Sequence, residues 1–193
     1  PIESFMTVTI LGKSIPFQGK GLMPGTLALG LNSWNAGTFR AGEQRTLNLP
    51  VNNIGDTNLG IPRVATPGFS VVAQNCGTEI IPGESCMMVV SAQKAISQEY
   101  TELLQFYTLD SGTLYSMDFI ADIQPGPPAG SIEFQPGDVQ IVADTTSQTV
   151  VTTKPIRDVF GNVVSDGEVV VATPSNINIV GSTSATTVNG IVS

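Results

Sequence analysis

Few residues of this chain could take part in chemistry, and histidine is absent. Without His, the sequence holds no Ser–His or Cys–His nucleophile pair and no His-type zinc site. Cys76 and Cys86 are the only cysteines, and two thiols alone do not make a zinc site. They stand ten positions apart across a Pro-Gly turn, so they could face each other on neighbouring strands, as a disulfide or as two buried thiols. We expect no catalytic residue and no cofactor.

Three acidic residues of the second half could in principle bind a cation. Asp158, Asp166 and Glu168 are close in sequence, and carboxylate oxygens are the ligands that Ca²⁺ prefers. However, the Asp-x-Asp-x-Asp spacing of a calcium loop is missing, and aspartates in turn-rich segments more often cap the turns themselves. We therefore predict no metal site.

Trp34 is the candidate for contact with a glycan. A tryptophan ring can stack on a sugar face, and Trp34 is the single tryptophan of the chain. The alternative is that its ring fills the core, because aromatic residues make up only 6% of the sequence. Both interpretations remain open from sequence.

The composition predicts strands rather than helices. Charged residues are only 12% of the chain, while 20 Gly and 13 Pro suit short strands joined by tight turns. The formal net charge is −8 and the basic residues are scattered, so no basic patch is available for nucleic acid. No apolar run is long enough to cross a bilayer, so we expect no membrane insertion.

A linker at residues 124–130, with the sequence Gln-Pro-Gly-Pro-Pro-Ala-Gly, divides the chain into two modules. Prolines without backbone donors, next to glycines, neither continue a sheet nor begin a helix. The first module then spans residues 31–123 and the second spans residues 131–193.

Residues 1–30 precede the first module. Met6, Val8 and Ile10 alternate with two threonines, which predicts a half-buried strand at 5–11. Glycines and prolines crowd the segment 12–30 and predict an extended arm. The strand is either an extra edge strand of the first module or an arm that pairs with a neighbouring subunit, with Met6, Val8 and Ile10 as its contact residues.

The first module has the pattern of an immunoglobulin-like β-sandwich. Alternating apolar residues predict strands that are separated by Gly, Pro and Asn turns, in about 100 residues. The predicted strands are residues 46–51, 69–72, 87–92, 103–109 and 114–123. In the last of these, Tyr115, Met117, Phe119, Ala121 and Ile123 share one face.

Three stretches of this module carry a family resemblance. Residues 52–59 (Asn-Asn-Ile-Gly-Asp-Thr-Asn-Leu), 69–71 (Phe-Ser-Val) and 75–90, with Cys-Gly and then Ile-Pro-Gly-Glu-Ser-Cys, follow in the order found in Hydin-like immunoglobulin domains. The module resembles that family. The resemblance implies a disulfide between Cys76 and Cys86 and an exported protein.

The second module contains a further motif. Predicted strands at 131–134, 139–143 and 149–153 precede residues 156–171, which read Ile-Arg-Asp-Val-Phe-Gly-Asn-Val-Val-Ser-Asp-Gly-Glu-Val-Val-Val. This motif is similar to the signature of bacterial immunoglobulin-like domains of the invasin and intimin type. Phe160 and Val169 are expected to plug the core, while Gly161-Asn162 and Asp166-Gly167 supply left-handed turn positions.

A complete sandwich needs about 100 residues, which is more than residues 131–193 provide. We therefore expect the module to be truncated, with its closing strands supplied by a continuing chain or by a strand of another chain. The whole sequence predicts a non-enzymatic structural or adhesive protein of a bacterial surface structure, an adhesin or filament, or of a phage virion. Its partners would be other protein subunits, self by strand addition, or a host-surface protein or glycan. The alternative is a carbohydrate-binding accessory module of a larger secreted enzyme.

Overall fold

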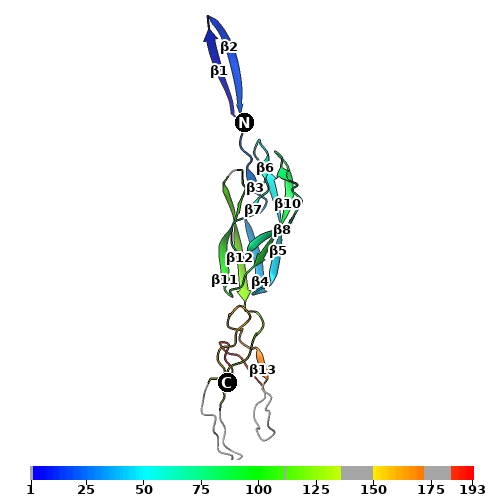
Figure 1. The fold of residues 1–193 in the computed structure, drawn as a ribbon, viewed down its shortest axis with the longest axis vertical. Coiled ribbons are helices and arrows are strands. Elements are labelled where there is room, and N and C mark those ends of the chain that lie inside the picture. The colour runs from blue at the N-terminus through cyan, green and yellow to red at the C-terminus, as the bar shows by residue number, and fades with distance from the viewer. Residues whose placement is uncertain (1, 111, 136–149, 172–183) are drawn as a thin grey trace, which may run out of the picture. The chain divides into compact units, whose positions relative to one another are not determined.

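The computed structural model describes residues 2–110, 112–135, 150–171 and 184–193 (Figure 1). Every regular element in these ranges is a β-strand, which confirms the all-β prediction. The strands are β1 (Ile2–Ile10), β2 (Lys13–Gly21), β3 (Leu27–Leu29), β4 (Ser33–Arg40), β5 (Gln44–Asn53), β6 (Leu59–Gly60), β7 (Arg63–Val64), β8 (Phe69–Gln74), β9 (Glu79–Ile80), β10 (Ser85–Gln93), β11 (Glu99–Tyr107), β12 (Leu114–Gln124), β13 (Val169–Val171) and β14 (Ser184–Thr186). The described residues contain no helix that could span a membrane.

Two four-stranded sheets form the sandwich that the sequence predicts. One has the order β3-β5-β10-β8 and the other the order β4-β12-β11-β7. In the first sheet β10 pairs antiparallel with β5 over nine positions, from Ser85 opposite Asn52 to Gln93 opposite Gln44. A two-stranded sheet of β6 and β9 accompanies them. The five strands predicted in this module lie within or overlap β5, β8, β10, β11 and β12.

The core of the sandwich comes from the alternation within its strands. In β12 the side chains of Met117 and Phe119 are buried, and their neighbours Asp118 and Ile120 are exposed. This pattern is expected for sheets that pack on one face and meet water on the other. The fully buried side chains from the other strands include Leu49, Val51, Met88, Val90, Leu104 and Phe106.

A buried asparagine, Asn53, closes one end of this sandwich. Its side chain is fully buried, and its Oδ1 accepts hydrogen bonds from the backbone N–H groups of Thr26 (3.1 Å) and Gly55 (2.9 Å). Its Nδ2 donates to the carbonyl oxygens of Thr57 (2.7 Å) and Ile80 (2.9 Å). Both lone pairs of Oδ1 and both N–H bonds of Nδ2 thus have hydrogen-bond partners. This one side chain connects the residue before β3, the turn after β5, and β9.

The amino-terminal segment is a hairpin rather than an extended arm. Strand β1 overlaps the predicted strand at 5–11, although Met6 is 62% exposed and not half-buried. Strand β2 lies where an extended chain was predicted, and the two strands pair antiparallel over nine positions. A two-residue turn, Leu11-Gly12, joins them, and both residues have positive φ (51° and 75°). Pro16 is compatible with β2 because a proline is tolerated on an edge strand where its missing N–H would point away from the partner strand. We call residues 2–21 the amino-terminal hairpin.

The predicted linker is hydrogen-bonded to the second module. The N–H of Gly126 donates to Oδ2 of Asp158 (2.8 Å), and the N–H of Ala129 donates to the carbonyl of Arg157 (2.9 Å). The compact unit that contains this module also includes residues 38–43, 94–99 and 122–130. Residues 125–130 therefore form no strand, as predicted, but they are fixed in place by this module.

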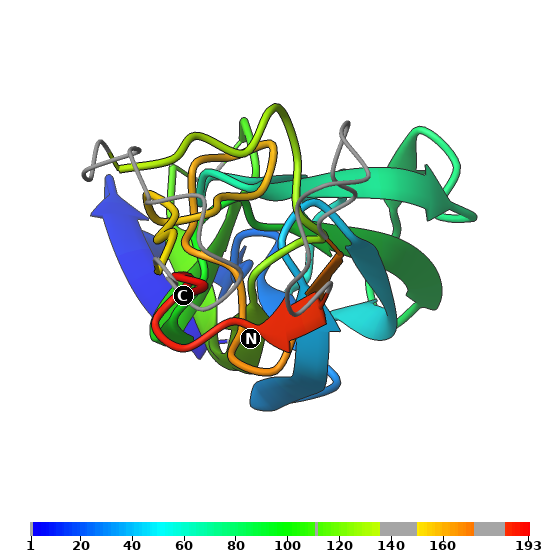
Figure 2. The same ribbon diagram turned by 90° about the horizontal axis from the view of Figure 1, so that it is seen from below.

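The second module has a small core of its own. Ile156, Val164 and Val192 are buried together, and Val170 and Ala185 pack against them. Strand β13 pairs with β14, which Figure 2 shows side by side in orange and red. The predicted strand at 139–143 lies outside the described residues, and residues 131–134 contribute only a single bridge, from Phe134 to Thr153. The second sandwich therefore stays a prediction.

The prediction that Phe160 and Val169 fill the core of this module is wrong. Phe160 is 48% exposed and Val169 is 67% exposed. The small core takes the alternate residue Val170 instead, and the Phe160 ring lies over Gly42, where a side chain would collide with it. The predicted left-handed positions at Gly161 and Gly167 do have positive φ, of 88° and 86°.

Candidate functional site

The amino-terminal hairpin is the part of the described chain with the strongest features of an interaction surface. Strands β1 and β2 form a two-stranded sheet, and in the part of the chain that the structure describes neither pairs with a further strand. An isolated two-stranded hairpin is marginally stable at best in water. The hairpin therefore presents backbone edges and side chains that a partner could cover.

Apolar side chains of the hairpin are exposed to solvent. Met6 is 62% exposed, Ile15 is 48% exposed and Leu11 is 99% exposed, while Val8 is half-buried. Because Val8 lies opposite Ile15 and Met6 is two positions away, these three residues share one face of the hairpin. On the other face the hydroxyls of Thr9 and Ser14 are hydrogen-bonded at 3.1 Å. Met6 and Val8, two of the three contact residues predicted on this strand, thus lie on its apolar face.

Leu11, which the sequence analysis did not single out, combines exposure with backbone strain. Its φ of 51° lies in the left-handed region, which a leucine adopts only at an energetic cost. Asn-Gly is the preferred sequence for a two-residue turn with two positive φ values, and here leucine takes the asparagine position. The signal was available, because Gly12 follows Leu11 between two stretches that alternate.

Replacing Leu11 by asparagine should stabilise the hairpin by about 1 kcal/mol, because asparagine tolerates positive φ. Amide hydrogen exchange in β1 and β2 should slow by about fivefold if exchange occurs through opening of the hairpin. Leu11→Ala is the control, since it removes the same exposed side chain without relieving the backbone. Equal exchange rates in Leu11→Asn and Leu11→Ala would show that the turn geometry does not limit hairpin stability.

The two cysteines are joined in the structure. A disulfide connects Cys76 and Cys86, whose Cα atoms are 5.0 Å apart, and it links the segment after β8 to β10. This arrangement places the bond at one end of the β3-β5-β10-β8 sheet. It has a structural role there, because both sulfurs are consumed in the bond.

Loss of this disulfide should lower the free energy of unfolding. For the short loop that it closes, the chain-entropy model predicts roughly 3 kcal/mol for the double variant Cys76→Ser/Cys86→Ser. Urea unfolding of the oxidised protein and of the double variant would measure the difference. A reductant should destabilise the native protein by the same amount and leave the double variant unchanged; a difference below about 1 kcal/mol would contradict the prediction.

Trp34 is not a glycan contact in this structure. Its side chain is only 6% exposed, and its ring packs edge-on against Phe119 at 5.2 Å and Phe69 at 6.4 Å between centroids. Phe69 and Phe119 complete a cluster of three mutually edge-on rings, with 4.8 Å between their centroids. The core-filling interpretation is therefore the correct one, since edge-to-face packing of rings is a favoured geometry in protein cores.

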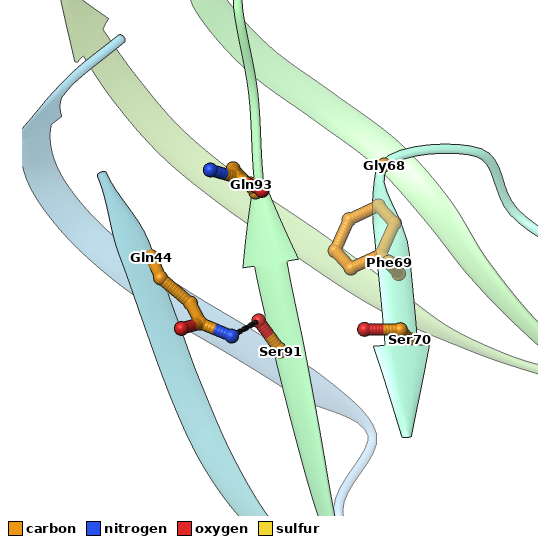
Figure 3. Close-up of a pocket in the computed structure, with 6 residues that line it drawn as sticks. All are labelled: Gln44, Gly68, Phe69, Ser70, Ser91 and Gln93. Carbon is orange, nitrogen blue, oxygen red and sulfur yellow. Dashed lines mark hydrogen bonds between the residues drawn. The ribbon is translucent and has the colours of Figure 1, made fainter. Parts of the chain in front are cut away.

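A small open pocket lies at the end of β5, β8 and β10 (Figure 3). Its volume is about 230 Å³, and it is lined by Gln44, Gly68, Phe69, Ser70, Ser91 and Gln93. Typical ligand pockets have about 300–1,000 Å³. Gln44 Nε2 donates to Ser91 Oγ at 2.6 Å, so two of its polar side chains bind each other. The pocket holds no charged residue among its lining and does not resemble an active site.

Two of the three acidic residues that could have bound a cation, Asp158 and Asp166, accept hydrogen bonds from backbone groups instead. The Asp158 carboxylate accepts hydrogen bonds from the N–H groups of Gly126, Phe160 and Asn162 and from the Asn162 side chain. Asp166 Oδ1 accepts from the N–H of Asn189 at 2.6 Å. Within the described ranges no three His, Cys, Asp or Glu side chains are grouped to hold a metal ion. These carboxylates therefore cap turns.

The hydrogen bonds around Asp158 change its acidity. Burial by itself raises the pKa of this carboxyl group, but hydrogen bonds from Asn162, Gly126 and Phe160 outweigh burial and lower the pKa below its ordinary value of 3.8. The hydrogen bonds in the second module thus stabilise the charged form of Asp158. Asn162 extends this network, because its Nδ2 also donates to the Ala95 carbonyl and its Oδ1 accepts from the N–H of Ser97.

Comparison with known proteins identifies no family. No family model matches the chain, and no curated protein matches it. Similar folds among solved structures include the VesB protease of Vibrio cholerae, with a TM-score of 0.36, 17% identity, and coverage of 50% of this chain and 31% of that one. The ASH/PapD-like domain of human CEP192 has a TM-score of 0.38 and 14% identity over 63% of this chain and 98% of that domain.

A third similar structure is the surface layer protein SbsC, domains 4–9, with a TM-score of 0.35, 16% identity, and coverage of 100% of this chain and 30% of that one. The chain spans less than a third of the length of VesB and of the secreted protease VesC, of which it covers 24%. These likenesses carry no conclusion about function. The fold defines a disulfide-containing β-sandwich protein with an amino-terminal β-hairpin.

Proposed function

We propose that the protein is a non-enzymatic structural subunit that joins other copies of itself through the amino-terminal hairpin. The assembly would be extracellular, as part of a bacterial surface structure or a phage virion. The single observation that carries this proposal is the two-stranded sheet with exposed Met6, Leu11 and Ile15. A hairpin of this kind needs a third strand or a packing partner for stability.

The disulfide supports the extracellular part of the proposal. Disulfides form and persist mainly in oxidising compartments, and the Cys76–Cys86 bond joins the only two cysteines of the chain. The polar side chains of both modules support the non-enzymatic part, because those described above are used for structure. Asn53, Asp158 and Asp166 each bind backbone groups of their own module.

The mass of the native protein in solution tests the proposal. We would compare the full chain with a version that lacks residues 1–21 by analytical ultracentrifugation over a range of concentrations. The full chain should associate, and the shortened chain should be monomeric with an unchanged unfolding transition of the sandwich. A full chain that stays monomeric at all concentrations would overturn the proposal.

A further inference from the structure

We propose that the contact between copies is made by the free edge of β1, which pairs antiparallel with β1 of a second copy. Two hairpins then form one four-stranded sheet with the order β2-β1-β1-β2. This inference rests on the proposed function and names the surface and the partner. Three features of the hairpin support the contact: its backbone register, its charges and the position of its one proline.

The register shows which backbone groups of β1 point away from β2. A two-residue turn places the flanking residues Ile10 and Lys13 in a hydrogen-bonded pair, and hydrogen-bonded and non-hydrogen-bonded pairs alternate from there. Thr9 and Thr7 therefore fall in non-hydrogen-bonded pairs. Their N–H and C=O groups are directed to the free edge of β1, where another strand could bind them.

Pro16 agrees with this register. It lies opposite Thr7, and its lack of an N–H disrupts no bond within the hairpin if this pair is not hydrogen-bonded. The missing donor then lies on the free edge of β2. Lys13 and Lys20 also lie on β2, and lysine and proline are the residues by which edge strands avoid further pairing. The edge of β2 is thus protected.

The edge of β1 has no such protection. From Ser4 to Ile10 the strand contains no charge and no proline, and Thr7, Val8, Thr9 and Ile10 are β-branched. Uncharged, regular edge strands are the ones that pair with other chains. The β8 edge of the sandwich is also uncharged, but it is interrupted by a register shift opposite Val89 and Val90, which makes it a poorer template.

The hairpin is free of the net negative charge that makes two copies repel each other elsewhere. The chain carries a formal net charge of −8, so two copies repel each other over most of their surface. Residues 1–26 contain Lys13, Lys20 and a single acidic residue, Glu3, so this segment is slightly positive. The hairpin is therefore the part through which two copies approach with the least repulsion.

The uncharged stretch also predicts the register between copies. It is centred on Thr7, so a two-fold axis at this residue sets Thr7 opposite Thr7 of the second copy and matches the outward N–H and C=O groups of Phe5, Thr7 and Thr9. Position 3 of one copy then lies opposite position 11 of the other, in the turn that Lys13 follows. Met6 and Val8 of both copies lie on the same face of the four-stranded sheet.

A proline substitution tests the edge directly. Thr7→Pro removes one outward N–H from β1 and no hydrogen bond within the hairpin. Gln18→Pro is the matched control, because Gln18 has the same orientation on β2, whose edge is already blocked at Pro16. Thr7→Pro should weaken association at least tenfold in analytical ultracentrifugation, and Gln18→Pro should leave it unchanged.

A cysteine substitution gives a positional readout that does not depend on stability. Cys76 and Cys86 are already bonded to each other, so Thr7→Cys introduces one free thiol. In the proposed register the two Cα atoms at position 7 would be about 5.5 Å apart, within the range of a disulfide. Mild oxidation should give a covalent dimer of Thr7→Cys and none of Gln18→Cys.

The outcomes separate the inference from the proposed function. In one outcome the full chain associates and the chain without residues 1–21 does not, but Thr7→Pro still associates and Thr7→Cys does not cross-link. This outcome would overturn the β1 contact and leave the hairpin as the joining element. Equal losses in Thr7→Pro and Gln18→Pro, again without cross-linking, would point to hairpin folding or to another partner surface and would also overturn it. A full chain that never associates removes both.

Discussion

Replacing Asn53 by alanine is expected to lower the free energy of unfolding of the sandwich by about 3–5 kcal/mol. The side chain is fully buried and makes four hydrogen bonds to backbone groups of Thr26, Gly55, Thr57 and Ile80. Alanine supplies none of them, so buried donors and acceptors would lose their partners. Unsatisfied buried groups are costly because they have given up water without compensation.

Urea unfolding, followed by the fluorescence of Trp34 in the core, would measure this loss. Asn52→Ala is the matched control, since Asn52 is the adjacent residue of β5 and is only half-buried. We expect less than about 1 kcal/mol for this control, as for most positions that are not buried. If Asn53→Ala had the same small effect, the turn after β5 would hold its geometry without the side chain.

The second large effect is expected at Asp158. Asp158→Asn keeps the size of the side chain but removes the charge. One carboxylate oxygen, which accepts hydrogen bonds from N–H groups, is replaced by an amide NH2 group, which only donates. The carboxylate accepts four hydrogen bonds, from Gly126, Phe160 and twice from Asn162. Hydrogen bonds to charged groups contribute about 1.5–3 kcal/mol each, so we expect the module to lose roughly 2–4 kcal/mol of stability at pH 7.

The pH dependence of this module should follow from the same carboxylate. The pKa of Asp158 is lower in the folded protein than its ordinary value of 3.8, so the unfolded state binds the proton more readily. Its contribution is therefore complete above about pH 5 and is lost as the pH falls through 3.8 and then through the lower folded pKa. Asp158→Asn should remove that part of the acid sensitivity.

Heteronuclear NMR spectra can follow both effects at Gly126, Phe160 and Asn162. Thermal unfolding, followed by the loss of these signals at several pH values between 7 and 3, should show that the stability of the native protein falls more steeply with decreasing pH than that of Asp158→Asn. Asp166→Asn is the control, because Asp166 is exposed and accepts a hydrogen bond from the N–H of Asn189. Parallel pH profiles for native protein and Asp158→Asn would exclude Asp158 as the source.

Much of the candidate surface could be predicted from sequence, and its limits have physical reasons. The alternation of Met6, Val8 and Ile10 identified β1 because a strand places every second side chain on one face. Strand β2 was missed because Pro16 and several glycines are typical of extended coil. Only the pairing with β1 shows that Pro16 can lie at an edge position that needs no donor.

The same difference applies to the polar residues. Asn53 and Asp158 stand in segments rich in turn-forming residues, and sequence alone assigns such residues to exposed turns. Their burial depends on neighbours distant in the chain, such as Ile80 for Asn53 and Gly126 for Asp158. Trp34 shows the reverse case, since a side chain that could have bound a glycan instead fills the space between Phe69 and Phe119.

Composition and alternation alone predict a chain built of strands and the position of the first sandwich, and these 193 residues contain no histidine. These properties depend on composition and on local periodicity, which the order of residues states directly. The three-dimensional fold was needed to show that the amino-terminal segment is a hairpin, that Trp34 is buried, and that Phe160 and Val169 are exposed. Those properties depend on which strands pair and on which side chains meet across the chain, and local pattern does not encode either.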